Sequence, residues 1–216
     1  MIRILVADDH TLVREGLKQI LQSAADFQVA GEASNGLEVL AQLKQEQWDV
    51  LLLDMSMPGR SGIELIKQIK EEKPRLPILV LTMHGEQQYA IRAFKAGVAG
   101  YLTKESASAE LVSAVRKVAS GGVYVSVAIA EKLALNLSPQ TEELPHQRLS
   151  DREFDVFRRL VSGQTVSEIG DALSVSVKTV STHKTRILQK MEMQNQTELI
   201  RYAISHNLVD DIGATE

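Results

Sequence analysis

Hydrophobic and polar residues follow two different rhythms along the 216 residues of the chain. In the first half, short apolar runs alternate with amphipathic stretches in which apolar residues recur at helical spacing, as at Leu17, Ile20 and Leu21. The apolar runs are Ile2–Ala7, Phe27–Ala33, Val50–Asp54, Pro77–Thr82 and Gly100–Thr103. Five strands that alternate with five helices predict an α/β domain with a doubly wound, five-stranded parallel sheet.

The rhythm changes after Ser120. The sequence GGVYV at 121–125 indicates a turn and a short extended piece, residues 126–137 fit one helix, and the polar, proline-containing stretch at 138–148 indicates a linker. From Leu149 onward the pattern is helical only. We therefore predict a first domain at residues 1–121, a linker with a short helix at residues 122–146, and a small all-α domain at residues 147–210.

The amino-acid composition limits the classes of protein to which the chain can belong. Hydrophobic residues make up 44% and charged residues 24% of the chain, which is ordinary for a globular protein. Cysteine is absent, so there is no disulfide framework and no thiol metal site. We read no signal peptide and no membrane-spanning run, and we expect a cytoplasmic protein. Because the net charge is -4, a nucleic-acid-binding surface would have to be a local basic patch.

Polar side chains stand at the ends of the predicted strands. Asp8 and Asp9 close the first strand, Asp54 the third and Thr82 the fourth, and Lys104 follows the fifth. Because the carboxyl ends of parallel strands share one edge, these side chains should meet there. Three carboxylates together require a cation, and oxygen ligands favour Mg²⁺, while the lysine and the hydroxyl suit a phosphoryl group. Taken singly, each aspartate is better explained as a turn former or helix cap, whereas all five residues at the right strand ends favour a site.

Four stretches of the first half carry a family resemblance. VADDH, LLLDMSMPGRSGIELIKQI, ILVLTMH and AGVAGYLTKESASAELVSAV occur in the order seen in receiver domains, and roughly the first 120 residues resemble that flavodoxin-like domain of bacterial two-component response regulators. The resemblance implies that Asp54 accepts a phosphoryl group from a histidine kinase. It also implies Mg²⁺ ligation by Asp9, Asp54 and the backbone carbonyl of Ser56, with Asp8 acting through water.

Three further residues take roles from the same resemblance. Thr82 would donate a hydrogen bond to the phosphoryl oxygens, Lys104 would pair with them, and Tyr101 matches the aromatic switch position. A lone tyrosine on a strand is also explained by packing alone. Ser56 and His84 stand two residues past Asp54 and Thr82, where the family sets how fast the phosphoryl group is lost.

The second half contains a predicted helix-turn-helix. Four short helices are predicted: Ser150, Ser176 and Asn195 cap the first, third and fourth, and the second starts at Thr165 or Val166. In the third helix, Val177, Val180, Ile187, Leu188 and Met191 share one face that should pack inward. Small polar residues and basic flanks form the other side, with no acidic residue between Lys178 and Lys190. Such a helix after a short turn is typical of DNA binding, although a solvated amphipathic helix has the same pattern.

This half also resembles a known family. LSDREFDVFRRLVSGQTVSEIGDALSVSVKTVSTHKTRILQKM is similar to the LuxR-type output domain of the NarL/FixJ response regulators. The resemblance implies that the third helix reads DNA, and that the last helix pairs two copies into a homodimer. Packing on the same small core explains the residues of the last helix equally well. The candidate DNA-binding residues are Lys178, Ser181, Thr182, His183, Lys184, Thr185, Arg186 and Lys190. Gly170 stands where alanine is usual, and a tight helix crossing would explain it.

These observations predict a phosphorylation-dependent transcriptional regulator that binds promoter DNA. Two alternatives stay open at this point. One is a phosphatase that uses Asp54 as a transient nucleophile, against which the sequence DMSMP has no second carboxylate placed as an acid. The other is a phosphorylation-dependent switch whose C-terminal helices bind a protein and not DNA, against which the basic third helix argues.

Overall fold

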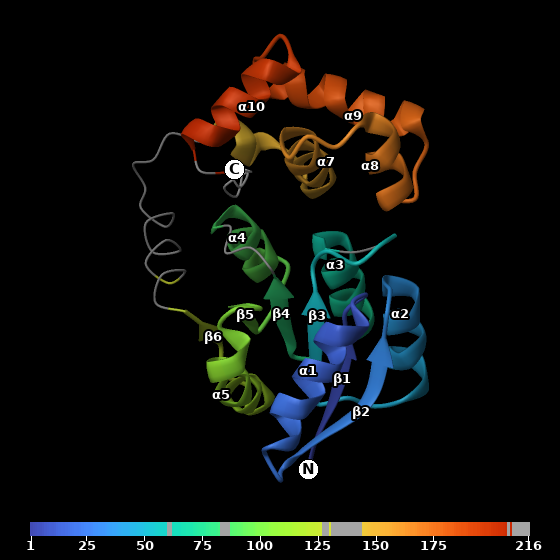
Figure 1. Cartoon of the computed structure of the whole chain (residues 1–216), viewed down its shortest axis with the longest axis vertical. Helices are drawn as coiled ribbons and strands as arrows, with labels where there is room; N and C mark the ends of the chain where they lie inside the picture. The colour runs from blue at the N-terminus through green and yellow to red at the C-terminus, as the bar shows by residue number, and fades with distance from the viewer. Residues whose placement is uncertain (60–61, 83–86, 127–129, 131–143, 207, 209–216) are drawn as a thin grey trace. The chain divides into compact units, whose positions relative to one another are not determined.

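The computed structural model divides the chain into two compact units, Met1–Leu137 and Ser138–Glu216. It describes residues 1–59, 62–82, 87–126, 130, 144–206 and 208 (Figure 1). His84 lies outside the described residues. So does the helix predicted at residues 126–137, apart from positions 126 and 130. The predicted domain boundaries stay a prediction.

A six-stranded parallel sheet forms the centre of the first unit, in the order β2-β1-β3-β4-β5-β6 (Figure 1). Its strands are β1 (Ile2–Ala7), β2 (Phe27–Ala33), β3 (Val50–Asp54), β4 (Ile78–Thr82), β5 (Gly100–Thr103) and β6 (Tyr124–Val125). Every residue of β3 and β4 is buried, as expected for central strands covered on both faces. The predicted α/β fold with a parallel sheet is confirmed, and β6 extends it by one strand.

Helices cover both faces of this sheet. They are α1 (Thr11–Gln22), α2 (Gly36–Gln45), α3 (Gly62–Glu72), α4 (Gln87–Lys95) and α5 (Ala107–Ala119). Leu17 and Leu21 of α1 share one hydrophobic cluster with Leu111 and Val115 of α5, so these two helices lie on the same face. Helices α2, α3 and α4 cover the other face (Figure 1).

The connection that leads to β6 has an unusual hand. Helix α1 leads from β1 outward to β2, whereas α5 leads in the opposite direction across the sheet, from β5 to β6. Because both helices lie on the same face, the two crossovers have opposite hands. Right-handed crossovers are the rule for parallel strands, so the β5–α5–β6 connection is the left-handed one. Strand β6 pairs Gly100 with Tyr124 and Tyr101 with Val125.

The second unit is helical throughout its described part. It contains a short 3-10 helix, η1 (Pro145–Arg148), followed by α7 (Asp151–Val161), α8 (Val166–Ala172), α9 (Val177–Lys190) and α10 (Gln196–Ser205). The predicted caps Ser150, Ser176 and Asn195 each accept a hydrogen bond from the first turn of their helix. Of the two starts predicted for the second helix, α8 begins at Val166, and Thr165 caps it in the same way. The predicted all-α architecture of this half is confirmed.

Gly170 and Val177 test two expectations about α8 and α9. A Cβ added to Gly170 would lie 2.9 Å from the backbone oxygen of Val175, which explains the glycine by a close approach of the turn. The expectation that Val177 packs inward is wrong, because its side chain is 51% exposed. The buried stripe is narrow and runs through Val180 and Ile187 of α9 to Met191, the residue that follows the helix. Val177 lies about 60° to its side, as the 100° turn per residue dictates.

Within the part of the chain that the structure describes, we find no helix with the length and apolarity needed to cross a lipid bilayer.

Candidate functional site

Four side chains meet at the carboxyl edge of the sheet in the first unit. Asp8, Asp9 and His10 form the turn between β1 and α1, and Asp54 is the last residue of β3. One donor atom from each of these four residues lies within 4.8 Å of the others. Strands β1 and β3 are neighbours in register, with Ala7 opposite Leu53, so the carboxylates that follow these two residues lie side by side.

Lys104 neutralises two of these carboxylates. Its Nζ lies 2.6 Å from Asp8 Oδ2 and 3.1 Å from Asp54 Oδ2, and all three side chains are nearly inaccessible to solvent. Burial raises the pKa of the Asp54 carboxyl above its ordinary value, although the charge of Lys104 opposes that rise. Burial alone would lower the pKa of the Lys104 ammonium, but Asp8 and Asp54 outweigh it and raise that pKa. The lysine is therefore a fixed positive charge at this site.

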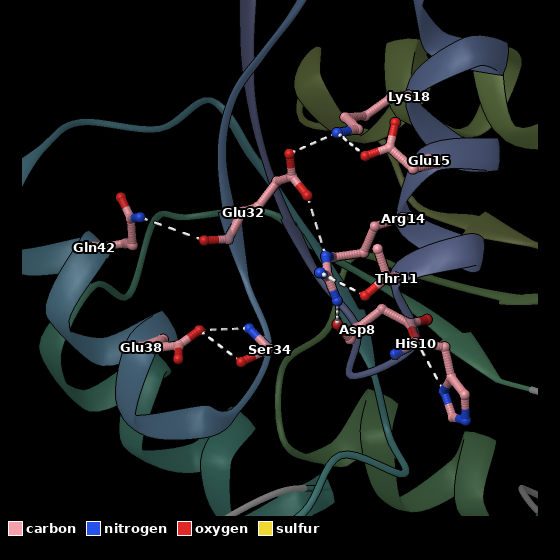
Figure 2. Close-up of polar contacts among 10 residues, drawn as sticks. All are labelled: Asp8, His10, Thr11, Arg14, Glu15, Lys18, Glu32, Ser34, Glu38 and Gln42. Atoms are coloured by element: carbon pink, nitrogen blue, oxygen red, sulfur yellow. Dashed lines mark hydrogen bonds and ion pairs between the residues drawn. The ribbon is translucent and has the colours of Figure 1, made fainter.

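The backbone of the β1–α1 turn is held by hydrogen bonds that sequence reasoning missed (Figure 2). The His10 amide donates to Asp8 Oδ1 over 2.9 Å. The guanidinium of Arg14 donates to the backbone oxygen of Asp8 over 2.7 Å and to Glu32 Oε2 over 3.1 Å. Lys18 binds the other oxygen of Glu32 over 2.7 Å. A single arginine in an amphipathic helix gave no sign of this role in the sequence.

The remaining predicted residues of this site lie on the neighbouring strands and loops. The Ser56 amide donates to Asp54 Oδ1 over 3.2 Å. Thr82 ends β4 with its side chain buried, and its backbone oxygen accepts a hydrogen bond from the Lys104 amide over 2.7 Å. Tyr101 is buried in β5, with 1% of its surface exposed, opposite Val80.

The donor set fits a divalent cation. Asp9 Oδ1 is buried and accepts no hydrogen bond from the described residues, although it faces the other carboxylates. A buried carboxylate oxygen without a donor carries a desolvation cost that a cation offsets. Oxygen donors from three carboxylates are the ligands that Mg²⁺ prefers.

Helix α9 presents a polar, basic surface in the second unit. Lys178, Ser181, Thr182, Thr185 and Arg186 are exposed, while His183 and Lys184 are half-buried. Thr182 Oγ1 donates to the backbone oxygen of Lys178 over 2.9 Å, and Thr185 Oγ1 donates to that of Ser181 over 3.1 Å. Because both hydroxyl protons are bound within the helix, each threonine presents an acceptor and a methyl group outward.

Two lysines of α9 also bind within their own unit. Lys190 Nζ lies 2.6 Å from Oε2 of Glu153, the buried capping residue of α7. Lys184 donates to Gln196 Oε1 over 2.7 Å, and Gln196 in turn donates to the backbone oxygen of Leu160 over 3.0 Å. These two lysines help to join α9 to α7 and α10, which sequence reasoning did not anticipate.

Known families match both units. The family described as the response regulator receiver domain matches residues 4–116, and that of the bacterial regulatory proteins of the luxR family matches residues 147–203. The response regulator UvrY of Escherichia coli is 39% identical over 209 residues, which span 96% of each chain. The chain belongs to the NarL/FixJ family of response regulators. The response regulator GacA of Pseudomonas viridiflava is 38% identical over 211 residues, covering 97% of this chain and 99% of the relative.

Solved structures of RcsB resemble this response regulator over nearly its whole length. RcsB from Salmonella enterica serovar Typhimurium, bound to promoter rprA in the presence of a phosphomimetic, is 29% identical with a TM-score of 0.70, covering 95% of this chain and 100% of RcsB. A second RcsB–DNA complex is 29% identical with a TM-score of 0.60, covering 94% and 98%. The response regulator therefore combines a receiver domain with a luxR-type DNA-binding domain, and its family consists of transcription regulators rather than a class of enzymes.

Proposed function

We propose that this response regulator accepts a phosphoryl group on Asp54 from a histidine kinase, and that phosphorylation controls its binding to promoter DNA. The observation that carries the proposal is the position of Lys104, whose ammonium contacts Asp8 and Asp54 at once at the end of the sheet. A buried carboxylate at a strand end, with a fixed cation beside it, suits a nucleophile that receives a phosphoryl group.

Each residue of the site has a distinct task in this proposal. Asp54 attacks phosphorus while the bond from phosphorus to the histidine nitrogen of the kinase breaks, and Lys104 pairs with the charge that the phosphoryl oxygens bring. Asp9, Asp54 and the backbone carbonyl of Ser56 would hold Mg²⁺, with Asp8 acting through water. When bound, Mg²⁺ supplies positive charge against the phosphoryl oxygens during transfer. The hydroxyl of Thr82 donates a hydrogen bond to the phosphoryl oxygens, and Tyr101 changes packing in response.

The DNA-binding part of the proposal rests on α9. Exposed small polar residues suit base edges, and exposed cations suit phosphates. We assign Ser181, Thr182 and Thr185 to bases, and Lys178, His183, Lys184 and Arg186 to the backbone. Lys184 and Lys190 contact DNA only if they exchange their partners Gln196 and Glu153 for a phosphate. RcsB binds DNA as dimers, and we propose a homodimer on two half-sites for this chain as well.

The proposed organisation follows from these roles. Residues 1–121 form the receiver, residues 122–146 the linker and residues 147–210 the DNA-binding domain. Since the proposed DNA partner lies in the cytoplasm of a bacterial cell, we place the protein there too. The protein turns over no phosphoester in this proposal, and steady-state hydrolysis of a chromogenic phosphate ester at a rate above that of Asp54→Asn would contradict this part.

One experiment tests both halves of the proposal. The full chain is incubated with a pool of random duplex DNA, with and without a small-molecule phosphodonor plus Mg²⁺, and bound DNA is sequenced. We expect a two-fold symmetric motif that binds about 5- to 150-fold more tightly with the phosphodonor, the usual size of such coupling. Asp54→Asn should take up no phosphoryl group and should bind equally in both conditions.

The outcomes separate the claims. Normal phosphorylation of Asp54→Asn would overturn the assignment of the phosphoacceptor. A motif that does not respond to the phosphodonor would keep DNA binding and overturn its control by Asp54. Binding without steep salt dependence would argue for a protein partner instead, because phosphate contacts make affinity fall as salt rises.

A further inference from the structure

The imidazole of His10 lies beside the carboxylates without hydrogen-bonding to them. Its Nδ1 is 3.0 Å from Asp9 Oδ1 and 3.3 Å from Asp8 Oδ1. Yet Asp9 Oδ1, a buried atom, accepts no hydrogen bond from the described residues, so the ring is not aligned to donate to it. His10 Nδ1 and Asp9 Oδ1 are therefore in contact without the alignment of a hydrogen bond, which is the arrangement of two neighbouring ligands of one metal ion.

The distances agree with such an arrangement. In an octahedral site with bonds of about 2.1 Å, neighbouring ligand atoms lie about 3.0 Å apart. The Nδ1 of His10 has that spacing from Asp9, and it belongs to the same group of donor atoms as Asp54 Oδ. The turn is fixed by the bond from the His10 amide to Asp8, so the ring is held at this edge by its own backbone.

The His10 ring lies on the solvent side of the site, above the buried carboxylates. The carboxylates of Asp8 and Asp54 are buried and form the floor of the site, whereas the His10 side chain is 64% exposed. Its Nδ1 faces the carboxylates and the other ring nitrogen is available to water. The single proton of a neutral imidazole can reside on that outer nitrogen, which leaves a lone pair on Nδ1 toward the site.

A nitrogen donor changes which ions the site selects. Mg²⁺ takes oxygen ligands, while imidazole suits first-row transition ions, whose affinity for mixed nitrogen and oxygen sites exceeds that of Mg²⁺. We propose that His10 is a direct ligand in this site, so that the site binds a divalent transition ion such as Co²⁺ through one nitrogen and the carboxylates. Mg²⁺ binds the carboxylates without His10. The inference rests on the cation site of the proposed function.

Metal titrations of the full chain test this ligand. Equilibrium dialysis with Co²⁺ alone and with Mg²⁺ alone is measured for the unaltered protein and for His10→Ala. We expect His10→Ala to lower Co²⁺ affinity by about tenfold or more, since the loss of an outer-shell partner alone reaches about that size. Mg²⁺ affinity should change by less than about twofold. An unchanged Mg²⁺ affinity also shows that the site of the variant is folded. His206→Ala removes an exposed histidine of the second unit and is the matched control.

Spectroscopy identifies the ligand directly. Proton NMR of the Co²⁺-loaded chain should show a strongly shifted, exchangeable imidazole N–H resonance that is absent from His10→Ala and present in His206→Ala. Equal Co²⁺ affinities in the unaltered chain and His10→Ala, or persistence of that resonance, would overturn the inference. Asp54→Asn should weaken both ions. If it weakens neither, the cation site of the proposed function fails, and if only His10→Ala is without effect, the ligand assignment alone fails.

Discussion

Lys104 holds together the charge arrangement of the receiver, and replacing it with the apolar, similarly long methionine tests that arrangement. Its Nζ lies 2.6 Å from Asp8 Oδ2 and 3.1 Å from Asp54 Oδ2. With an effective dielectric constant of about 20, these distances correspond to attractions of about 6 and 5 kcal/mol. Lys104→Met removes both attractions and leaves two buried carboxylates facing each other without a counter-charge.

The measurable loss is smaller than the sum of these attractions, because one carboxyl can take up a proton instead. Bringing a carboxyl from its ordinary pKa of 3.8 to neutrality at pH 7 costs about 4 kcal/mol, at about 1.4 kcal/mol per pKa unit. We therefore expect Lys104→Met to lower the free energy of unfolding of the first unit by about 4 kcal/mol at pH 7. That value agrees with the loss typical of a buried pair deprived of one partner.

The same reasoning fixes the pH dependence. In the folded variant the carboxyl has a pKa above that of the unfolded chain, so the folded state holds one more proton. Stability then falls as pH rises, by about 1.4 kcal/mol per unit between about pH 4 and pH 7. The loss relative to the unaltered protein should accordingly shrink to about 2 kcal/mol at pH 5.

Trp48 gives a clean signal for this measurement, because it is the only tryptophan and belongs to the first unit. Urea unfolding is followed by its fluorescence at pH 5, 6 and 7 in the presence of a chelator. Lys18→Met is the control, since Lys18 also pairs with two carboxylates, Glu15 and Glu32, but at the surface, where the effect should be small. A loss below about 1 kcal/mol at pH 7, or one that does not grow with pH, would refute the reasoning.

Three further changes have defined outcomes. Gly170→Ala should lower the melting temperature of the second unit, because the added Cβ meets a backbone oxygen at 2.9 Å, while Gly16→Ala, with open space around it, should stabilise α1 by up to about 1 kcal/mol. Arg14→Gln should weaken Mg²⁺ binding by about tenfold, since the β1–α1 turn loses its donor, and Arg116→Gln, which breaks a surface pair, should not. Burial would raise the pKa of Glu153, but hydrogen bonds from the Lys190 ammonium and from Ser150 hold that pKa below 4.5. The second unit should therefore lose stability as pH falls through this lowered pKa, and Glu153→Gln should remove the acid sensitivity.

Each of these outcomes can fail separately. An unchanged or higher melting temperature for Gly170→Ala would mean that the turn relaxes to admit a methyl group. Equal Mg²⁺ affinities for Arg14→Gln and the unaltered chain would remove Arg14 from the support of the site. If circular dichroism shows the same acid midpoint with and without the carboxylate of Glu153, its hydrogen bonds contribute nothing to the pH dependence.

Most of the first unit was predictable because its central strands are buried on both faces. Such strands read as continuous apolar runs, and the predicted bounds of the strand at Val50–Asp54 agree with β3 residue by residue. Strand β6 was not predictable as a paired strand. It has two residues, too few for any alternation, and its pairing with Gly100 and Tyr101 depends on where α5 returns the chain.

The candidate site also has features that the sequence predicts and features that it does not. The strand-end rule brings Asp8, Asp9 and Asp54 to one edge, because backbone position alone decides it. The contacts of Arg14 depend on side-chain rotamers and on which strand lies beside α1, and a single sequence contains neither. Val177 shows the limit of helical periodicity, which gives the direction of a side chain but not the width of the face that a neighbouring helix covers.

The left-handed connection to β6 bears on the order in which the first unit opens. Val125 is the last residue of the sheet, and it is hydrogen-bonded in register to the strand that carries Tyr101. Two residues on the edge of a sheet open at far lower free energy than the five-stranded remainder, so amide hydrogens there should exchange by local opening rather than by global unfolding. The chain leaves the sheet at this two-residue edge strand. Any change in the packing of Tyr101 thus reaches the outgoing chain through one adjacent residue pair, Tyr101 and Val125.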